Sequence, residues 1–472
     1  MLSKFGVPAH LLSLIKRIHT GVVAKFKMGT EEVEIPNTSG TKQGDPLAAI
    51  LFLFHIQACL ETLDVEGLSF RTAAAGVEGT KGRGLTGSKG IRRSEGFSVA
   101  MSLYADDAGN LFETRAKLHE GLRKIFAHFK RFGLTMHVGR NGAASKTEAM
   151  FFPGAGHSYE DGDTSPMEVD GGTVTFTKSF VYLGSTLASS LTSNPDLEAR
   201  LSKASQVFGA LRGPVFATRD ISLRTKAKVY RGLVLSVLLY GSECWAPLAR
   251  DKAKLERFHR RCVRTMTGTS RRKQWKRHIT SVNLENRMGL ESLEYYLRTR
   301  TLRWVGHLVR MPYERLPRKL LFSWIRHPRK SGGQTLTYGR HVNTLLRQAT
   351  QLAPPNVRYD LTPGGAAGWA ELPNAPPPMG WIELAHDRTR WRQLAKAGQR
   401  FKPKATAHRQ RRRAQRTPAP ATPAMMPTAP DGVPAYMSSA YINWFDRLPA
   451  WMYGCYRPPQ MYARFIDEWT PS

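Results

Sequence analysis

The sequence predicts an α+β protein in three parts, and three observations lead to this prediction. Residues 1–188 alternate short strand-like segments with helical ones. Residues 189–330 hold consecutive segments whose apolar residues recur at helical spacing. Residues 331–472 are rich in Pro and Arg. We therefore expect a mixed domain, then a helical domain, then a basic and mostly disordered C-terminal region.

The first part opens with helix, hairpin and helix. Apolar residues three and four apart predict the helices, and short alternating runs around Gly29 predict the hairpin. A stretch rich in Gly, Ser and Lys follows, which is typical of a loop. The expected elements are a helix over 11–18, strands over 22–28 and 32–35, a helix over 47–58 and a mobile loop over 72–96.

The rest of the first part is predicted to contain two hairpins around a helix. Adjacent aspartates mark the first turn, and the helix has leucines, isoleucine and phenylalanines spaced four, three, four and three. The expected elements are a hairpin over 97–113, a helix over 118–132, an acidic glycine-containing loop over 153–172 and a hairpin over 173–188.

The helical part begins near Asn194, which is a good N-cap residue. Pro195 suits the first helical position, and Asp196 suits the positive end of a helix. Further helices are expected to about residue 325. Beyond 330 the chain is rich in Pro over 354–378, carries an Arg run, and is expected to be disordered over 401–435.

The charge of the chain indicates a polyanionic partner. Lys and Arg number 70 against 37 Asp and Glu, so the formal charge is +33. A field of this sign favours nucleic acid first and an anionic membrane surface second. A solvated basic surface with no dedicated ligand remains an alternative. Nothing in the sequence indicates a protein partner.

Cysteine usage and hydropathy predict where the chain works. Its four cysteines are scattered, so neither a disulfide framework nor a zinc site is expected. The N-terminal apolar stretch is short and interrupted by Pro8, His10 and Lys16, unlike a signal peptide. No window approaches the roughly 20 apolar residues of a membrane span. We expect an intracellular protein, nuclear or cytoplasmic, without a membrane partner.

The first candidate motif is Lys42-Gln43-Gly44-Asp45-Pro46-Leu47, which leads from a polar loop into an apolar helix. Gly44 permits close approach of a ligand to the backbone, and Asp45 can cap the helix. Taken alone, the motif also fits an ordinary helix start.

The second candidate motif is Tyr104-Ala105-Asp106-Asp107, which follows an apolar strand. Two carboxylates at a hairpin tip can converge on a hard divalent cation. Phosphoryl transfer uses such sites, because paired metal ions activate the attacking oxygen and stabilise the leaving one. Taken alone, adjacent aspartates are also a common turn pair that binds nothing.

Together the two motifs resemble the reverse transcriptases of non-LTR, LINE-type retrotransposons. A QGDP-type loop entering an apolar helix, then a strand ending in YADD, is that family's pattern. The resemblance covers about residues 1–325 and a patch at 381–392. Further similar segments are Phe132–Met136, Ser145–Glu148, Phe180–Gly184, Leu239–Trp245, Leu255–Cys262, Leu302–His307 and Ala385–Arg392.

The resemblance implies a partial right-hand polymerase palm over 1–188 and a helical thumb over 189–330. It implies RNA-directed DNA polymerase activity with Mg²⁺ as cofactor, and an RNA template, a DNA primer or target DNA, and dNTP as partners. It implies these roles: metal ligands Asp106 and Asp107; a lysine near the phosphates, Lys146; template and nucleotide contacts Gln43 and Gly44; a residue beside the primer terminus, Tyr104; and a primer-positioning hairpin, Tyr182, Leu183 and Gly184.

The match fails at one motif. In this family a third metal-binding carboxylate precedes the segment that begins here at Lys4, and no Asp precedes Asp45. Losing one bridging ligand removes a contact to both metal ions. We expect an N-terminally truncated copy that does not polymerise DNA alone. The alternative is a non-enzymatic, basic nucleic-acid-binding remnant.

The basic segment over 257–278 is the predicted nucleic-acid surface. It carries nine Lys and Arg, no acid, and the aromatic residues Phe258 and Trp275. Cations that neutralise phosphates, together with stacking aromatics, are typical of single-strand or hybrid binding. A basic helix face with core aromatics is the alternative. The binding residues expected are Arg257, Arg260, Arg261, Arg264, Arg271, Arg272, Lys273, Trp275, Lys276 and Arg277. The Arg run over 409–416 is a second candidate, either for nuclear localisation or for RNA binding.

Overall fold

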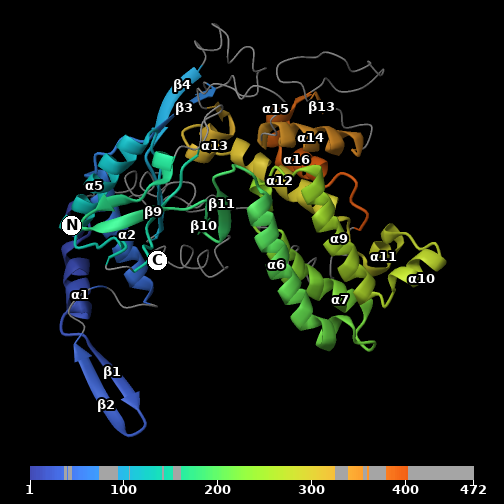
Figure 1. Ribbon diagram of the computed structural model, residues 1–472, viewed down its shortest axis with the longest axis horizontal. Coiled ribbons are helices and arrows are strands. Elements are labelled where there is room, and N and C mark those ends of the chain that lie inside the picture. The colour runs from blue at the N-terminus through green and yellow to red at the C-terminus, as the bar shows by residue number, and fades with distance from the viewer. Residues whose placement is uncertain are drawn as a thin grey trace, which may run out of the picture. The chain divides into compact units, whose positions relative to one another are not determined.

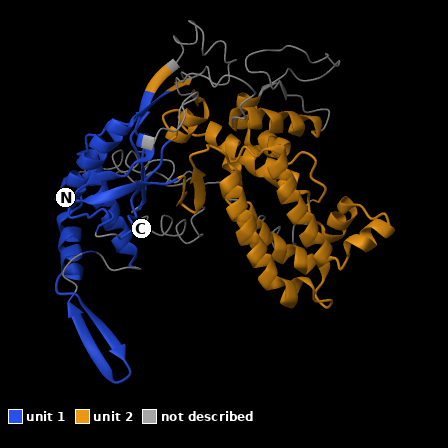
Figure 2. Ribbon diagram, viewed as in Figure 1, with its two compact units in different colours: residues 1–70, 97–151, 158–177 blue, residues 71–96, 152–157, 178–472 orange. Residues whose placement is uncertain are grey.

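The computed structural model divides into two compact units, which Figure 2 shows in blue and orange. The first unit comprises residues 1–70, 97–151 and 158–177, and the second comprises 71–96, 152–157 and 178–472. The structure describes residues 1–36, 40, 45–73, 94–105, 107–140, 143–152, 161–324, 338–353, 359–360 and 379–401.

The first unit mixes helices with short strands, as the sequence predicts (Figure 1). Strands β3 (Leu68–Ala73) and β4 (Ser94–Val99) contribute residues to both units. The other elements are η1 (Leu2–Phe5), α1 (Ala9–His19), β1 (Val23–Met28), β2 (Glu31–Pro36), α2 (Pro46–Glu61), β5 (Met101–Tyr104), β6 (Asp107–Asn110), α5 (Arg115–Arg131), β7 (Glu148–Ala149), η2 (Asp161–Thr164), β8 (Met167–Val169) and β9 (Gly172–Phe176).

Helix α2 begins as its sequence predicts. Asp45 Oδ1 accepts a hydrogen bond of 2.9 Å from the Leu47 amide, and Pro46 occupies the first turn. An Asx cap and an N-terminal proline satisfy or remove amides that would otherwise lack partners. The loop side of this motif, residues 42–44, lies outside the described residues.

The core of the first unit lies between α5 and the three-stranded sheet β7-β9-β8. Leu122 and Phe126 of the helix pack against buried Val169 and Val174 of the sheet. The helix therefore buries the face that its apolar spacing predicts.

Residues 167–188 form two hairpins where the sequence predicts a loop followed by a single hairpin. Strand β8 pairs with β9 through a turn at Asp170 and Gly171, both with positive φ, and residues 179–188 form a separate hairpin. The prediction of a loop to residue 172 and one hairpin over 173–188 is therefore wrong. The Asp-Gly pair, a strong signal for a two-residue hairpin turn, predicts the earlier turn.

The second unit is helical apart from a few short strands (Figure 1). It consists of β10 (Ser179–Tyr182), β11 (Ser185–Ala188), α6 (Asn194–Leu211), η3 (Arg212–Phe216), α7 (Leu223–Val229), η4 (Tyr230–Val234), α8 (Leu235–Leu238), η5 (Ser242–Cys244), α9 (Ala249–Met266), α10 (Arg271–Lys276), α11 (Ser281–Met288), α12 (Leu293–Val309), α13 (Leu316–Leu321), β12 (Ser323–Trp324), α14 (Tyr338–Gln351), β13 (Tyr359–Asp360), β14 (Met379–Gly380), α15 (Trp381–His386) and α16 (Arg388–Ala395).

The main core of the second unit joins α6, α9, α11 and the segment 223–239. Tyr230, Leu238, Leu255 and Leu284 are among its fully buried side chains. Helix α6 begins at Asn194, with Ser193 at the N-cap position, one residue earlier than predicted. The Ser193 hydroxyl accepts a hydrogen bond from the Ala246 amide rather than from its own helix.

Helical structure continues beyond residue 330. Helices α14, α15 and α16 pack on α12 around buried Leu302, Val305, Leu346 and Leu384. The patch predicted at 381–392 coincides with α15 and most of α16. Of the region predicted to be disordered, 402–435 lies outside the described residues.

Trp391 of α16 lies across Gly306 of α12. A Cβ atom added at Gly306 would overlap the Trp391 indole, whose nitrogen donates a hydrogen bond of 2.7 Å to the Leu302 carbonyl. A glycine is therefore required where the two helices meet. Among the helices that the structure describes, none has the length and apolar content needed to cross a bilayer.

Candidate functional site

The β5–β6 hairpin carries the acidic motif. Its register pairs Tyr104 with Asp107 and Leu103 with Ala108, and Leu103 is buried. Ala105 in the turn has a φ of 52°, as a two-residue hairpin turn requires. The register places Asp107 at the start of β6, where its side chain is exposed. Asp106 lies outside the described residues.

The donor chemistry at this tip suits Mg²⁺. Carboxylate oxygens are the ligands this ion prefers, and it usually combines one or two of them with substrate phosphates and water. Within the described ranges, which omit Asp106, no group of three His, Cys, Asp or Glu side chains could hold a metal ion. Asp107 is thus the only carboxylate of the acidic motif that the structure describes, and Asp106 is its neighbour in the chain.

Lys146 lies in a fixed turn of the first unit. Its amide donates a hydrogen bond of 3.1 Å to His137 Nδ1, and the adjacent Ser145 hydroxyl bonds to both the amide and the carbonyl of Thr147. The Lys146 side chain is exposed. No hydrogen bond or ion pair joins it to Asp107 in the described structure. The other predicted contacts in this part of the chain, Gln43 and Gly44, lie outside the described residues.

The predicted primer-positioning residues form the turn of the β10–β11 hairpin. Tyr182 pairs with Ser185, and Leu183 and Gly184 between them have φ values of 47° and 80°. Both carbonyls of this turn accept hydrogen bonds from side chains elsewhere in the second unit. The Tyr240 hydroxyl donates to Leu183 over 3.1 Å, and the Arg200 guanidinium donates to Gly184. The left-handed turn is therefore fixed from outside the hairpin.

Asp196 also joins the β10–β11 hairpin to helix α6. Its Oδ1 accepts a hydrogen bond of 2.9 Å from the Thr186 amide, and its Oδ2 accepts one of 2.8 Å from Trp245 Nε1. The Arg200 guanidinium lies 4.1 Å from the centre of the Tyr240 ring, and its Nε lies 3.6 Å from Asp196 Oδ1. Asp196 and Arg200 are both buried. We call Asp196, Arg200, Tyr240 and Trp245 the hairpin clasp.

Sequence reasoning missed the hairpin clasp as part of a site. The sequence predicts Asp196 only as a residue that suits a helix end, and Tyr240 and Trp245 only as parts of a segment similar to the family. One local signal was available, because residues 196 and 200 lie four apart on one helix face.

The basic segment lies on α9 and α10. Of the predicted binding residues there, Arg264 is half-buried and all the others are exposed. Burial lowers the pKa of Arg264, and the nearby Arg271, Arg260 and Arg261 lower it further. The two aromatic residues separate: Phe258 packs in the core at 4 % exposure, whereas Trp275 is 76 % exposed. Phe258 therefore cannot serve as the stacking residue suggested by the sequence.

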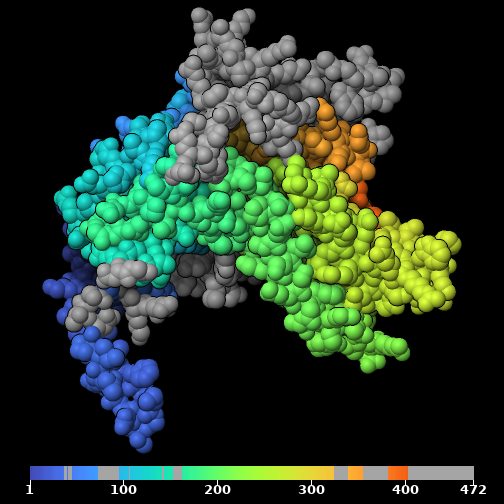
Figure 3. All heavy atoms as spheres, viewed as in Figure 1, coloured from blue at the N-terminus to red at the C-terminus, as the bar shows by residue number. Residues whose placement is uncertain are grey.

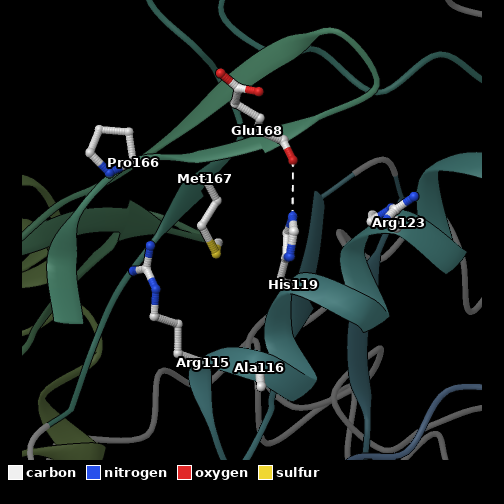
Figure 4. A pocket seen from close by; sticks show the side chains of 7 residues that line it. All are labelled: Arg115, Ala116, His119, Arg123, Pro166, Met167 and Glu168. Atoms are coloured by element: carbon white, nitrogen blue, oxygen red, sulfur yellow. Dashed lines mark hydrogen bonds between the residues drawn. The ribbon is translucent and has the colours of Figure 1, made fainter. Parts of the chain in front are cut away.

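A surface pocket of about 710 Å³ lies between α5 and β8 (Figure 4). It is lined by Arg115, Ala116, His119, Arg123, Pro166, Met167 and Glu168, none of which the sequence analysis selected. The Arg115 guanidinium is engaged by the carbonyls of Asp163 and Ser165 and the Ser165 hydroxyl. His119 Nε2 lies 3.0 Å from the Glu168 carbonyl oxygen. These two side chains thus hold the 161–168 segment in place.

A buried polar cluster surrounds His259 of α9. The Tyr230 hydroxyl and His259 Nδ1 are 2.9 Å apart, and His259 Nε2 lies 3.8 Å from Glu285 Oε1. Arg400 pairs with Glu285 at 2.7 Å and with Glu291 at 3.4 Å. Burial, together with Arg260 and Arg400, lowers the pKa of His259 to about 4.

Comparison with known proteins gives one partial similarity. No family model matches the chain. Over 228 residues, 47 % of the chain, it is 25 % identical to a Drosophila melanogaster protein described as a probable RNA-directed DNA polymerase from transposon BS. The match spans 23 % of that protein's length.

Proposed function

We propose that the chain is a reverse-transcriptase-like nucleic-acid polymerase region of a non-LTR retrotransposon. The β5–β6 hairpin carries this proposal, because its register places the exposed Asp107 opposite Tyr104, at the end of a half-buried strand in which Leu103 is buried. The similarity to a transposon polymerase over 228 residues supports it. In this proposal the first unit corresponds to part of a palm, and the helices from α6 onward to a thumb.

The proposed roles follow the resemblance. Asp106 and Asp107 would hold Mg²⁺, which supplies charge stabilisation for phosphoryl transfer when bound. Tyr104 lies beside the primer terminus, and Lys146 lies near the phosphates. Gln43 and Gly44 contact the template and the incoming dNTP. The turn at Tyr182, Leu183 and Gly184 positions a DNA primer or target strand, and the hairpin clasp fixes that turn relative to α6.

A second function is favoured by a separate observation. The exposed cations of α9 and α10 form a basic surface that is independent of the acidic hairpin. Phosphate neutralisation alone supports sequence-independent binding. The chain would then be a non-enzymatic nucleic-acid-binding protein.

The experiment uses the full chain with a primed RNA template, dNTPs and Mg²⁺, and measures hybrid binding, metal binding and primer extension. Extension that is lost in Asp106→Ala and Asp107→Ala but kept in Asp64→Ala establishes the polymerase. Asp64 is the matched control because it is an exposed acid of the same unit.

Two other outcomes have distinct meanings. Hybrid and metal binding that depend on the aspartates, without extension, would show a polymerase site that does not turn over in this chain alone. Hybrid binding without aspartate-dependent metal binding selects the second function. No hybrid binding at all contradicts both functions.

A further inference from the structure

Helix α9 presents a continuous basic face. Arg257, Arg260, Arg261 and Arg264 lie within one third of its circumference, opposite the apolar face that joins the core. We call these residues the basic stripe, and it extends about 10 Å along the helix. Arg260 pairs with Glu256 at 3.2 Å, whereas no acid occurs from Arg257 to His278.

Helix α10 holds an exposed tryptophan beyond the end of this stripe. Ser270 caps the helix by accepting a hydrogen bond of 3.1 Å from the Lys273 amide, and Gln274 Nε2 donates to the Ser281 hydroxyl over 3.4 Å. These two hydrogen bonds fix helix α10 in place. Trp275 projects from the helix, and 76 % of its surface is exposed. Figure 1 shows α10 at the outer end of the helical unit, and Figure 3 shows the yellow-green atoms of this region uncovered.

The residue types on this surface favour single-stranded nucleic acid over a membrane or a duplex. All four stripe cations are arginines, whose planar fork matches phosphate oxygens. A membrane-anchoring helix needs a broad apolar face, but every other residue of α10 is polar or charged. An exposed indole flanked by Lys and Arg residues instead matches the platforms on which unpaired bases stack. Bases inside a duplex are already stacked on each other and are not available to it.

We propose that the basic stripe and Trp275 form a binding site for single-stranded nucleic acid, in which the stripe contacts phosphates and Trp275 stacks on an unpaired base. This inference rests on the nucleic-acid partner of the proposed function but not on its chemistry. It adds a preference for unpaired strands, which a basic surface alone does not supply.

The test measures fluorescence anisotropy of short labelled single-stranded RNA, single-stranded DNA and blunt duplex DNA with the full chain. Trp275→Ala is expected to weaken single-strand binding about 5- to 150-fold, the range that base–aromatic stacking supplies. Trp275→Phe should restore part of that loss, and duplex binding should stay unchanged. Since Trp275 is exposed, thermal unfolding of the variants should match that of the parent.

The stripe is tested through salt dependence. Combined Arg257→Gln, Arg260→Gln and Arg264→Gln should reduce the slope of log affinity against log salt by about 2, at roughly 0.7 per phosphate contact. Trp275→Ala should leave that slope unchanged. Arg224→Gln with Lys228→Gln, exposed cations of α7 in the same unit, is the control and should change neither property.

Failure of the proposed function and failure of the stacking site give different results. If the parent chain binds no nucleic acid at about 50 mM salt, the nucleic-acid partner of the proposed function fails. If the parent binds but Trp275→Ala has no effect, or weakens duplex and single strand equally, the stacking site is wrong. Binding to anionic phosphatidylserine vesicles that requires Trp275, with nucleic-acid binding unaffected, would make this surface a membrane contact instead.

Discussion

Trp245 Nε1 donates a hydrogen bond of 2.8 Å to Asp196 Oδ2, although the two residues are 49 positions apart in the chain. The other oxygen of Asp196 holds the Thr186 amide of the β10–β11 hairpin. One buried carboxylate therefore joins the hairpin, α6 and the segment after α8. The hairpin turn at Leu183 and Gly184 is held to this helical framework rather than by its own strands alone.

The first prediction concerns this carboxylate. Asp196→Ala leaves the Trp245 and Thr186 donors without their acceptor and the Arg200 guanidinium without its ion-pair partner. We expect a loss of about 3–5 kcal/mol in the free energy of unfolding, the usual cost of breaking a buried charged contact. Trp245→Phe removes one hydrogen bond to a charged group and should cost about 1.5–3 kcal/mol besides the change in ring size. Urea unfolding measures both.

Asp220→Ala is the control, because Asp220 is an exposed acid of the same unit. Equal stability of the Asp196 and Asp220 variants would show that the hairpin clasp does not stabilise the fold.

The second prediction concerns the contact between α12 and α16. Gly306→Ala places a methyl group on the Trp391 indole, so the helices must separate or the hydrogen bond to Leu302 must break. Overpacking of this kind costs about 1–3 kcal/mol. The matched control is Gly209→Ala in α6, where a Cβ meets nothing within 4 Å. That change should stabilise the chain by up to about 1 kcal/mol. Thermal melting that gives both variants the same shift would contradict the contact.

The third prediction is a pH dependence of stability. The pKa of His259 is about 4 in the folded chain, below its ordinary value of 6.5, because the ring is buried. As the pH falls through 6.5 the unfolded chain takes up the proton first, so stability decreases toward pH 4. Between about pH 7 and 5, this residue alone should cost about 2 kcal/mol.

His341 shifts in the same direction and to about the same value, through burial and the nearby Lys252. Urea unfolding at both pH values should therefore show a smaller loss for His259→Gln and for His341→Gln than for the parent chain. A pH-dependent loss as large in both variants as in the parent would rule out these histidines as its source.

The fourth prediction concerns Arg400. Its guanidinium faces the carboxylates of Glu285 and Glu291, both about 5 % exposed. Arg400→Met leaves these acids without that cation and should cost about 3 kcal/mol. Lys396→Met, an exposed change in the same segment, is the control. If urea unfolding shows that the two variants are equally stable, Arg400 is not the cation that stabilises the carboxylates of Glu285 and Glu291.

Local patterns predicted much of the fold, because they report which face of a helix or strand is apolar. The helix over 118–132 follows from the spacing of its apolar residues, and the hairpin at Asp107 follows from adjacent aspartates after an apolar strand. The same reasoning could have separated the two aromatics of the basic segment. Phe258 lies three residues after Leu255 and four before Cys262 on one apolar face, whereas Trp275 has no apolar companion in α10.

The hairpin clasp could not be predicted in this way. Periodicity identifies the face that Asp196 and Arg200 share, but not the partners that a distant segment brings to it. Their contacts with Tyr240 and Trp245 depend on how η4, α8 and η5 return the chain to α6. The contact of Trp391 with Gly306 likewise joins segments that are separate in the sequence.

The most direct measurement is Mn²⁺ binding to the full chain with a primed RNA template, followed by electron paramagnetic resonance. This measurement does not depend on turnover. The proposed polymerase site predicts saturable binding that is lost in Asp106→Asn and Asp107→Asn and kept in Asp64→Asn. Mn²⁺ binding that is the same in all three variants and the parent would contradict the assignment of the β5–β6 hairpin as a metal-dependent polymerase site.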